Sequence, residues 1–239
     1  MRAHESRGSE RETVNKMGTM RTGRSRRLLL TLLLTLPLGA AGCSERERIT
    51  PPGDVTPTGL VESGWDAFED GDFEGARGDF AQAAADSAGF GEAHLGLGWA
   101  RLNLGQNNGV LDEAIQSFTT AFGLGETGAD ALGGRAAANL ARNNPNAALT
   151  DALAARTASP TFVFEHRTTF NSADLRLIEA FALAAAAQFS GALTTADAIS
   201  ASGIVQSNPA TFVVDGVTFP SFGSAVLAHL QKLSNQVAG

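Results

Sequence analysis

The pair Gly64-Trp65 recurs as Gly98-Trp99, 34 residues further along the chain. Gly71, which lies six residues after Trp65, recurs in the same way as Gly105. A period of this length is typical of proteins built from stacked supersecondary units, because one such unit is too small to bury its own apolar face. The chain is therefore expected to fold as an array of repeated units.

The similarity continues into the second half of each unit. Residues 73–76 (Phe-Glu-Gly-Ala) match residues 111–114 (Leu-Asp-Glu-Ala) at an offset of 38, and the four extra residues fit into a loop at 106–109. Each unit is interpreted as a helix, a tight Gly or Asn turn and a second helix. Columns of alanine favour this arrangement, because two antiparallel helices approach closely where side chains are small and a large neighbour fills the gap.

Two fainter copies follow the first two. The third has a helix predicted over 132–141, a turn at 143–145 and an end at Pro160. The fourth spans 173–203, and its first helix is expected to be capped by Asn171 or Ser172 and to stop at Gly191. Its second helix is predicted to begin near Ala192.

This pattern resembles the tetratricopeptide repeat family. The residues that carry the resemblance are Gly71, Asp72, Phe73, Ala76, Phe80 and Ala83 in the first unit, Leu97, Gly98, Gly105, Ala114, Phe118 and Ala121 in the second, and Pro160 at the end of the third. The resemblance implies an all-α solenoid of three to four helical hairpins over residues 59–204. It also implies that the first helix of each unit lines a concave groove.

Two segments depart from the helical pattern. Residues 161–167 are predicted to form a short strand or an extended insertion. Residues 211–219 contain Asp215-Gly216 between β-branched and aromatic residues, which predicts a β-hairpin. Since a lone hairpin is marginally stable, Phe162 to Phe164 are expected to pack beside it. Residues 221–237 have apolar side chains at helical spacing and are predicted to cap the solenoid, so that 205–239 forms a hairpin and a capping helix.

The first 42 residues have the features of a secretory signal. They carry eight basic and three acidic side chains, followed by the leucine-rich run 28–38 and by small residues at 39–42. The run is shorter than a comfortable membrane-spanning helix, and a basic flank before such a run is typical of a signal peptide. Met1, Met17 and Met20 are all possible start residues.

Cys43, the one cysteine of the sequence, directly follows Ala-Ala-Gly. A single cysteine excludes an intrachain disulfide and a cysteine-rich metal site. The segment resembles a bacterial lipoprotein lipobox, which implies cleavage before Cys43 and lipidation of that residue. The alternatives are an ordinary secreted protein or an uncleaved signal anchor. Stable anchoring requires more than one acyl chain, as lipoprotein modification provides.

Residues 43–58 are rich in proline and threonine and are interpreted as a tether. The chain beyond residue 42 has 10 basic and 22 acidic side chains. This negative charge argues against general nucleic-acid binding and against direct attraction to anionic lipid headgroups. The predicted location is the bacterial cell envelope, on the periplasmic side of an outer membrane if two membranes are present.

No pattern in the sequence indicates catalysis, a cofactor or a metal site. His94, His166 and His229 are far apart in the sequence, and none has a second ligand at metal-site spacing. Residues 123–128 match G-x-G-x-x-G, but they follow a predicted helix instead of a strand and are interpreted as a loop between repeats. The protein is therefore not expected to be an enzyme.

Six residues are predicted to line a partner-binding groove on the first helices of units one and two: Trp65, Phe68, Glu69, Trp99, Leu102 and Asn103. Aromatic rings beside polar side chains suit an extended peptide or an amphipathic helix. The alternative is that both tryptophans are buried between units. Acidic residues between 62 and 79 form either a docking site for a basic partner or a solvated face.

Together these features predict a membrane-anchored scaffold that binds an envelope protein or peptide, with possible roles in outer-membrane, secretion or pilus assembly. The alternative is a small-ligand-binding lipoprotein associated with a transporter. That alternative requires a closed pocket around Trp65 and Trp99.

Overall fold

The computed structural model describes residues 55–105 and 107–237, which belong to one compact unit. The predicted signal segment, Cys43 and most of the tether lie outside these residues. The α-helices are α1 (Pro57–Glu69), α2 (Phe73–Asp86), α3 (Gly91–Leu104), α4 (Asn108–Gly123), α5 (Ala129–Ala141), α6 (Pro145–Ala158), α7 (Ser172–Ala185), α8 (Phe189–Asp197) and α9 (Phe222–Val237). None of these described helices combines the length and the apolarity that crossing a bilayer requires.

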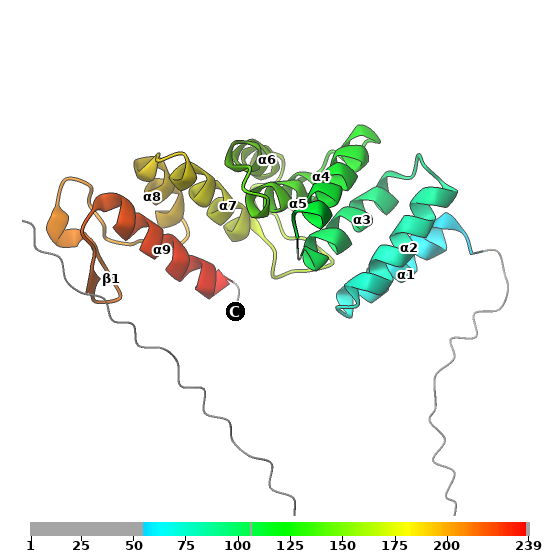
Figure 1. Ribbon diagram of the computed structural model, residues 1–239, viewed down its shortest axis with the longest axis horizontal. Coiled ribbons are helices and arrows are strands. Elements are labelled where there is room, and N and C mark those ends of the chain that lie inside the picture. The colour runs from blue at the N-terminus through cyan, green and yellow to red at the C-terminus, as the bar shows by residue number, and fades with distance from the viewer. Residues whose placement is uncertain (1–54, 106, 238–239) are drawn as a thin grey trace, which may run out of the picture. The chain divides into compact units, whose positions relative to one another are not determined.

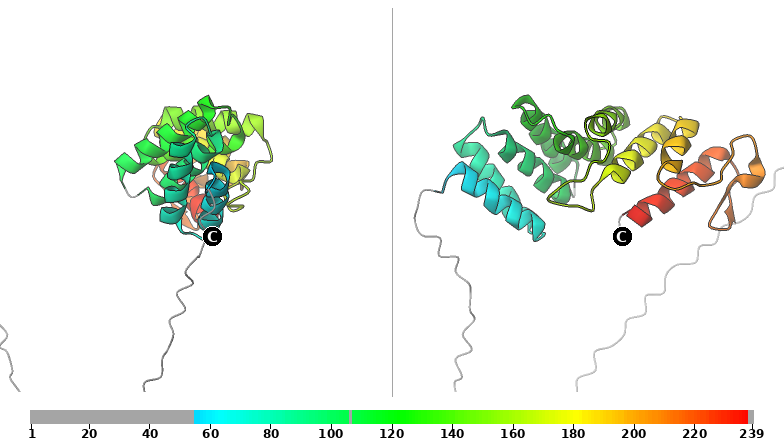
Figure 2. Two further views of the ribbon diagram at one scale, coloured as in Figure 1. Left: turned by 90° about the vertical axis from the view of Figure 1, so that its right-hand side faces the viewer. Right: turned by 180° about the vertical axis from the view of Figure 1, so that it is seen from behind.

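The first eight helices form four antiparallel hairpins that follow one another in chain order (Figure 1). The first helices of neighbouring hairpins contact each other, α1 with α3, α3 with α5 and α5 with α7, so they form an inner layer. The views in Figure 2 show the same succession from behind and from the end. The prediction of an all-α solenoid of helical hairpins is confirmed, and α1 begins at Pro57, two residues before the predicted start of the repeats.

Three of the four hairpins turn through the same backbone motif. Gly71, Asn143 and Ala187 have positive φ angles of 82°, 65° and 57°. In each turn the next N–H bonds to a carbonyl five residues earlier, as in the Gln188-to-Leu183 bond of 2.9 Å. The predicted helix end at Gly191 is wrong: α7 ends at Ala185, and Gly191 lies inside α8.

Replacing Ala187 by glycine is expected to stabilise the protein. The alanine Cβ makes the left-handed region unfavourable by about 1–2 kcal/mol, whereas glycine adopts it freely. After allowing for the greater freedom of glycine in the unfolded chain, we expect a gain of about 0.5–1 kcal/mol in urea unfolding. Ala186, with a φ of −84°, supplies the control: Ala186→Gly should be neutral or destabilising, and equal gains at both positions would contradict the explanation.

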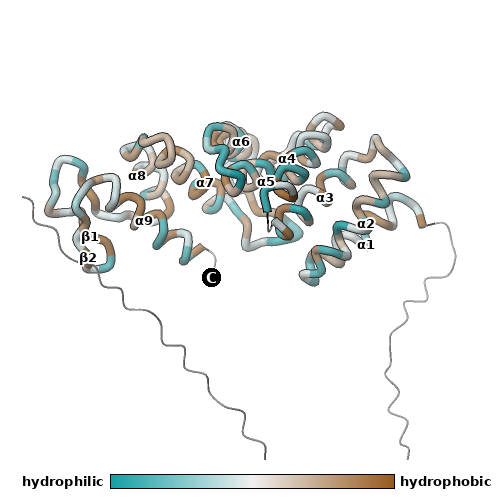
Figure 3. Tube along the Cα trace, in the orientation of Figure 1, coloured by the Kyte–Doolittle hydropathy of each residue, from teal (hydrophilic) through white to brown (hydrophobic). Residues whose placement is uncertain are grey.

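The core between hairpins is built from large rings set against glycines. Phe80 is fully buried, and its ring lies against Gly64 of α1 and Gly96 of α3; Phe118 lies in the same way against Gly98 and Gly134. The predicted alanine columns are buried throughout, at Ala76, Ala83, Ala114, Ala121, Ala148, Ala152, Ala155 and Ala196. Apolar and polar residues alternate along the helices (Figure 3), as expected for helices that bury one face.

Each hairpin also carries a polar side-chain pair between its two helices. The members are 16 residues apart in all four hairpins: Ser63 and Asp79, Arg101 and Ser117, Arg135 and Asp151, and Glu179 and Thr195. The Arg135–Asp151 pair is bidentate, at 2.7 and 2.9 Å. A further ion pair, Arg156 with Glu179, connects the third and fourth hairpins. The fainter third and fourth copies thus share this feature with the first two.

The C-terminal region follows the predicted order of hairpin and helix. Strands β1 (Val213–Val214) and β2 (Val217–Thr218) pair antiparallel around Asp215-Gly216. Helix α9 packs on α7 and α8, and together they surround a second apolar core. The expectation that Phe162 and Phe164 pack beside this hairpin is wrong, because both rings belong to the first core, formed by the earlier hairpins.

Acid is expected to weaken the attachment of α9. His229 is 4% exposed, its Nε2 lies 3.1 Å from the Ser200 carbonyl oxygen, and burial lowers its pKa below the ordinary value of 6.5. The unfolded chain therefore binds a proton at higher pH than the folded chain, so stability falls as pH drops below about 6.5. Tm measured between about pH 7.5 and 5.5 should fall less steeply for His229→Gln. Equal slopes for the variant and the native protein would contradict this assignment.

Candidate functional site

Residues 159–171, here called the strap, connect α6 to α7 and are far longer than the other connections between hairpins, 87–90 and 124–128. Residues 162–164 of the strap are extended, in part as predicted for residues 161–167, and Val163 makes one isolated bridge with Asn171. Two turns follow, in which Arg167 N–H donates to Phe164 O at 3.2 Å and Phe170 N–H donates to Arg167 O at 2.8 Å. The side chains of the strap alternate in burial. Phe162 and Phe164 are buried, whereas Val163 and Glu165 are exposed.

The strap lies over the inner layer of helices, on the two tryptophans of the repeat. The Phe164 ring stacks on Trp99 with centroids 4.1 Å apart, and the His166 imidazole stacks on Trp65 at 3.8 Å with parallel planes. Phe162 packs toward Gly133 of α5. Aromatic pairs of this kind contribute about 0.5–1.5 kcal/mol beyond the area they bury.

Polar contacts hold the middle of the strap, at His166 and Arg167. His166 Nδ1 lies 2.8 Å from Glu69 Oε1, and its Nε2 lies 3.4 Å from Glu165 Oε1. Arg167 Nη1 donates to Asn103 Oδ1 at 2.5 Å. Burial, and then the nearby Glu165, raise the pKa of Asp130 at the start of α5, so this carboxyl lies in the same acidic surroundings.

The structure corrects the expectation of an open groove at the predicted residues. Trp65, Phe68 and Trp99 are 6%, 3% and 2% exposed, because the strap covers them. Glu69 is exposed and binds His166, while Leu102 and Asn103 are half-buried. The closed pocket that the small-ligand alternative requires around the tryptophans is also wrong, because Phe164 and His166 occupy that position.

An open hollow of about 630 Å³ lies beside the strap, between α3, α5, α7 and α9. It adjoins a second hollow of about 310 Å³ with which it shares residues of α5, α7 and α9. The two are called the inner groove. They are lined by Leu102, Asn103, Ala137, Leu140, Ala141, Arg167, Thr169, Phe170, Asp174, Leu177, Ile178, Phe181, Ser234 and Val237.

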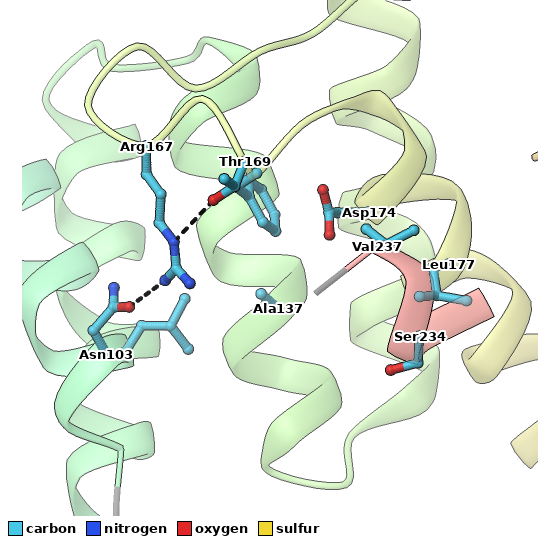
Figure 4. Close-up of a pocket in the computed structure, with 10 residues that line it drawn as sticks. Asn103, Ala137, Arg167, Thr169, Asp174, Leu177, Ser234 and Val237 are labelled. Carbon is cyan, nitrogen blue, oxygen red and sulfur yellow. Dashed lines mark hydrogen bonds between the residues drawn. The ribbon is translucent and has the colours of Figure 1, made fainter. Parts of the chain in front are cut away.

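The inner groove has a polar end and an apolar floor. Figure 4 shows Arg167 at one side, bonded to Asn103 and Thr169, with Asp174, Ser234 and Leu177 opposite. Burial raises the pKa of Asp174, although its carboxylate caps α7 by accepting from the Asn171 N–H at 2.8 Å. A few polar groups above an apolar surface can orient a peptide and bury its side chains.

Leu102 and Asn103 are the two predicted residues that line this groove. The other lining residues were missed because most of them come from α7, α9 and the strap, which meet only in the folded chain. The pattern Phe-x-Phe-x-His in an overlong connection was the signal for the strap, but nothing local shows where it docks.

The acidic segment 62–79, predicted to be a docking site or a solvated face, begins on α1. Glu62, Asp66 and Glu69 are exposed on the side of α1 opposite the buried Val61, and Asp70, directly after the helix, is exposed as well. Within residues 55–105 and 107–237, no three His, Cys, Asp or Glu side chains lie close enough together to hold a metal ion. Residues 124–128 form the loop between α4 and α5, as predicted from G-x-G-x-x-G.

Known structures share this arrangement of hairpins. The chain superposes on the MamA protein with a TM-score of 0.51 and 19% sequence identity, over 77% of this chain and 90% of that one. This is a tetratricopeptide-like solenoid. It superposes equally well, at 0.51 and 15% identity, on YrrB, described as a tetratricopeptide protein with an unusual peptide-binding site, over 75% of this chain and 88% of that one. No protein-family model matches the sequence, and no curated protein matches it.

Proposed function

We propose that this protein is an exported, lipid-anchored scaffold of the bacterial cell envelope that binds a peptide segment of a partner protein in the inner groove. The observation that carries the proposal is the groove itself. Its apolar floor on α5 and α7 can take apolar side chains, and Asp174 and Ser234 can meet polar groups of a peptide. The peptide-binding site described for YrrB supports the same use of this fold.

Peptide binding is tested by photo-crosslinking in cells. A photoreactive phenylalanine analogue replaces Ser234, which lies on α9 and lines both parts of the groove. The expected result is a crosslinked partner that disappears when Ala137→Arg fills the floor. Ala147→Arg, on the exposed surface of α6, is the matched control and should leave the crosslink intact. A crosslink that survives Ala137→Arg in a folded protein would refute the groove.

The membrane anchor is supported by the sequence around Cys43 and is tested separately. Cys43→Ser removes the thiol that lipidation requires, so the variant should leave the membrane fraction and keep its unprocessed mass. The measurement is membrane fractionation followed by intact-mass analysis. A variant that remains membrane-bound at an unchanged mass relative to the native protein would refute the lipoprotein assignment. The lipid chains add roughly 0.8 kcal/mol per buried methylene, which explains why their loss should be decisive.

A further inference from the structure

The strap is attached to the helices by side chains and not by its backbone. Apart from the bonds at its two ends to α6 and α7, its backbone hydrogen bonds are made within residues 159–172, such as Phe164 N to Phe170 O at 2.9 Å and Ser172 N to Phe162 O at 2.8 Å. The contacts that reach α1 and α3 are made by side chains: the two ring stacks, the edge contacts of Phe164 and Phe170 with rings of these helices, and the bonds of His166 to Glu69 and of Arg167 to Asn103. This is the way in which a bound peptide is held by anchor side chains.

The surface under the strap has one place for each inward side chain. Phe162 packs beside Gly133, the Trp99 face receives Phe164, and the Trp65 face receives His166. Phe162 and Phe164 are two residues apart, which is the spacing of an extended chain. His166 follows in the turn that the bond from Arg167 N–H to Phe164 O closes. The surface that the strap covers, formed by Trp65, Trp99 and Gly133, is called the channel under the strap.

The charge around the third place favours a basic group. Glu69 contacts the imidazole directly, and Glu92 Oε1 accepts from Trp65 Nε1 at 3.4 Å on the same tryptophan. Asp130 is close enough for the charges of Glu165 and His166 to affect its pKa. A lysine, arginine or histidine side chain stacked on Trp65 would therefore meet carboxylates and an aromatic face, both of which attract cations.

We propose that the strap is an internal ligand, and that a partner segment with the pattern aromatic-x-aromatic-x-basic displaces it from the channel under the strap. The inference rests on the proposed peptide-binding function and names the chemistry of the partner. Arg167, Thr169 and Phe170 of the strap also line the inner groove. Displacement of the strap therefore removes one wall of that groove, so binding at the two places is coupled.

The test uses a fluorescent peptide with the sequence of residues 160–168 and the full-length chain. In the double variant Phe164→Ala/His166→Ala the strap loses two anchors and the channel becomes free. Fluorescence anisotropy should show the peptide binding this variant roughly tenfold or more tightly than the native protein, in which the strap competes. A peptide with alanine in place of its second phenylalanine should not bind.

Val163→Ala/Thr168→Ala is the matched control, because it changes two exposed residues of the strap and keeps both anchors. It should bind the peptide as weakly as the native protein. If the double variant fails to fold, as judged by circular dichroism, a dye attached to the strap of the otherwise native protein reports displacement of the strap instead. The Cys43→Ser/Val163→Cys chain carries one thiol, at a side chain that is 54% exposed, and excess peptide should increase the mobility of a dye placed there.

A peptide that neither binds the folded double variant nor mobilises the label would overturn the proposal and make the strap a fixed part of the core. This result is distinct from failure of the proposed function, which is judged by the crosslink from Ser234. If peptide binds the double variant but the protein with the native groove gives no crosslink from Ser234, the channel under the strap is supported and the inner groove is not. Loss of peptide binding alone leaves the inner groove supported.

Discussion

Replacing Gly96 by alanine is expected to lower the free energy of unfolding by about 2 kcal/mol, within the range of about 1–3 kcal/mol for overpacked cores. A Cβ at this position would overlap the Phe80 ring. The ring cannot move away, because it is fully buried and meets Gly64 and the Trp65 ring on its other sides. The overlap should therefore outweigh the gain in helix propensity of about 1 kcal/mol that alanine brings.

A second glycine makes the explanation testable by the sign of the effect. Gly78 lies in α2, and an added Cβ there would meet nothing within 4 Å. Gly78→Ala should therefore stabilise the protein, by up to about 1 kcal/mol, in the same urea titration. The smaller side chain of Phe80→Leu, introduced together with Gly96→Ala, should also recover part of the free energy of unfolding lost in Gly96→Ala. Destabilisation of equal size at both glycines would show that contact with Phe80 is not the cause.

Trp99→Ala should cost about 3–5 kcal/mol, as expected for truncation of a large buried ring. Trp99 is 2% exposed and contacts Phe118 of its own hairpin, Phe164 and Phe170 of the strap, and the notch at Gly134. The substitution removes the surface on which the strap stacks. The free energy of unfolding should therefore fall, and Phe164 should become more exposed to solvent. Chemical unfolding followed by circular dichroism measures the change.

Trp99→Phe separates ring packing from the indole N–H. Trp99 Nε1 is buried and has no hydrogen-bond partner among the described residues, so its removal leaves no group unpaired. We expect the phenylalanine variant to cost less than about 1.5 kcal/mol. Leu153→Ala, at a side chain that is 44% exposed on α6, should change stability by less than about 0.5 kcal/mol. A large cost in either variant would contradict the assignment of stability to the stacked ring.

The succession of hairpins could be predicted from the sequence because it depends on local spacing. The recurrence of Gly-Trp and the alanine columns indicate which residues face a neighbouring helix, and those alanines are buried in the structure. The end of α7 could not be predicted, since alanine has no preference for the left-handed backbone that Ala187 adopts. That conformation is imposed by the geometry of the hairpin.

The candidate site depends on contacts that local patterns do not encode. The spacing of Phe162 and Phe164 predicts an extended apolar segment, but Phe164 covers tryptophans on helices about 65 or more residues earlier in the chain. The inner groove likewise requires α9 to return onto α7. The repeat pattern therefore indicates some of the participants, Trp65, Trp99, Leu102 and Asn103, but neither the residues of α7 and α9 nor the arrangement.

The strap also affects the order in which the stacked hairpins can unfold. Hairpins that contact only their neighbours can open from one end, so the first hairpin would ordinarily fray by itself. Here the bond between His166 and Glu69 ties α1 to a segment that begins after the third hairpin. We therefore expect the first three hairpins to open as one cooperative block while the strap is docked. Release of the strap converts the N-terminal hairpin into a free end whose amide hydrogens exchange with solvent.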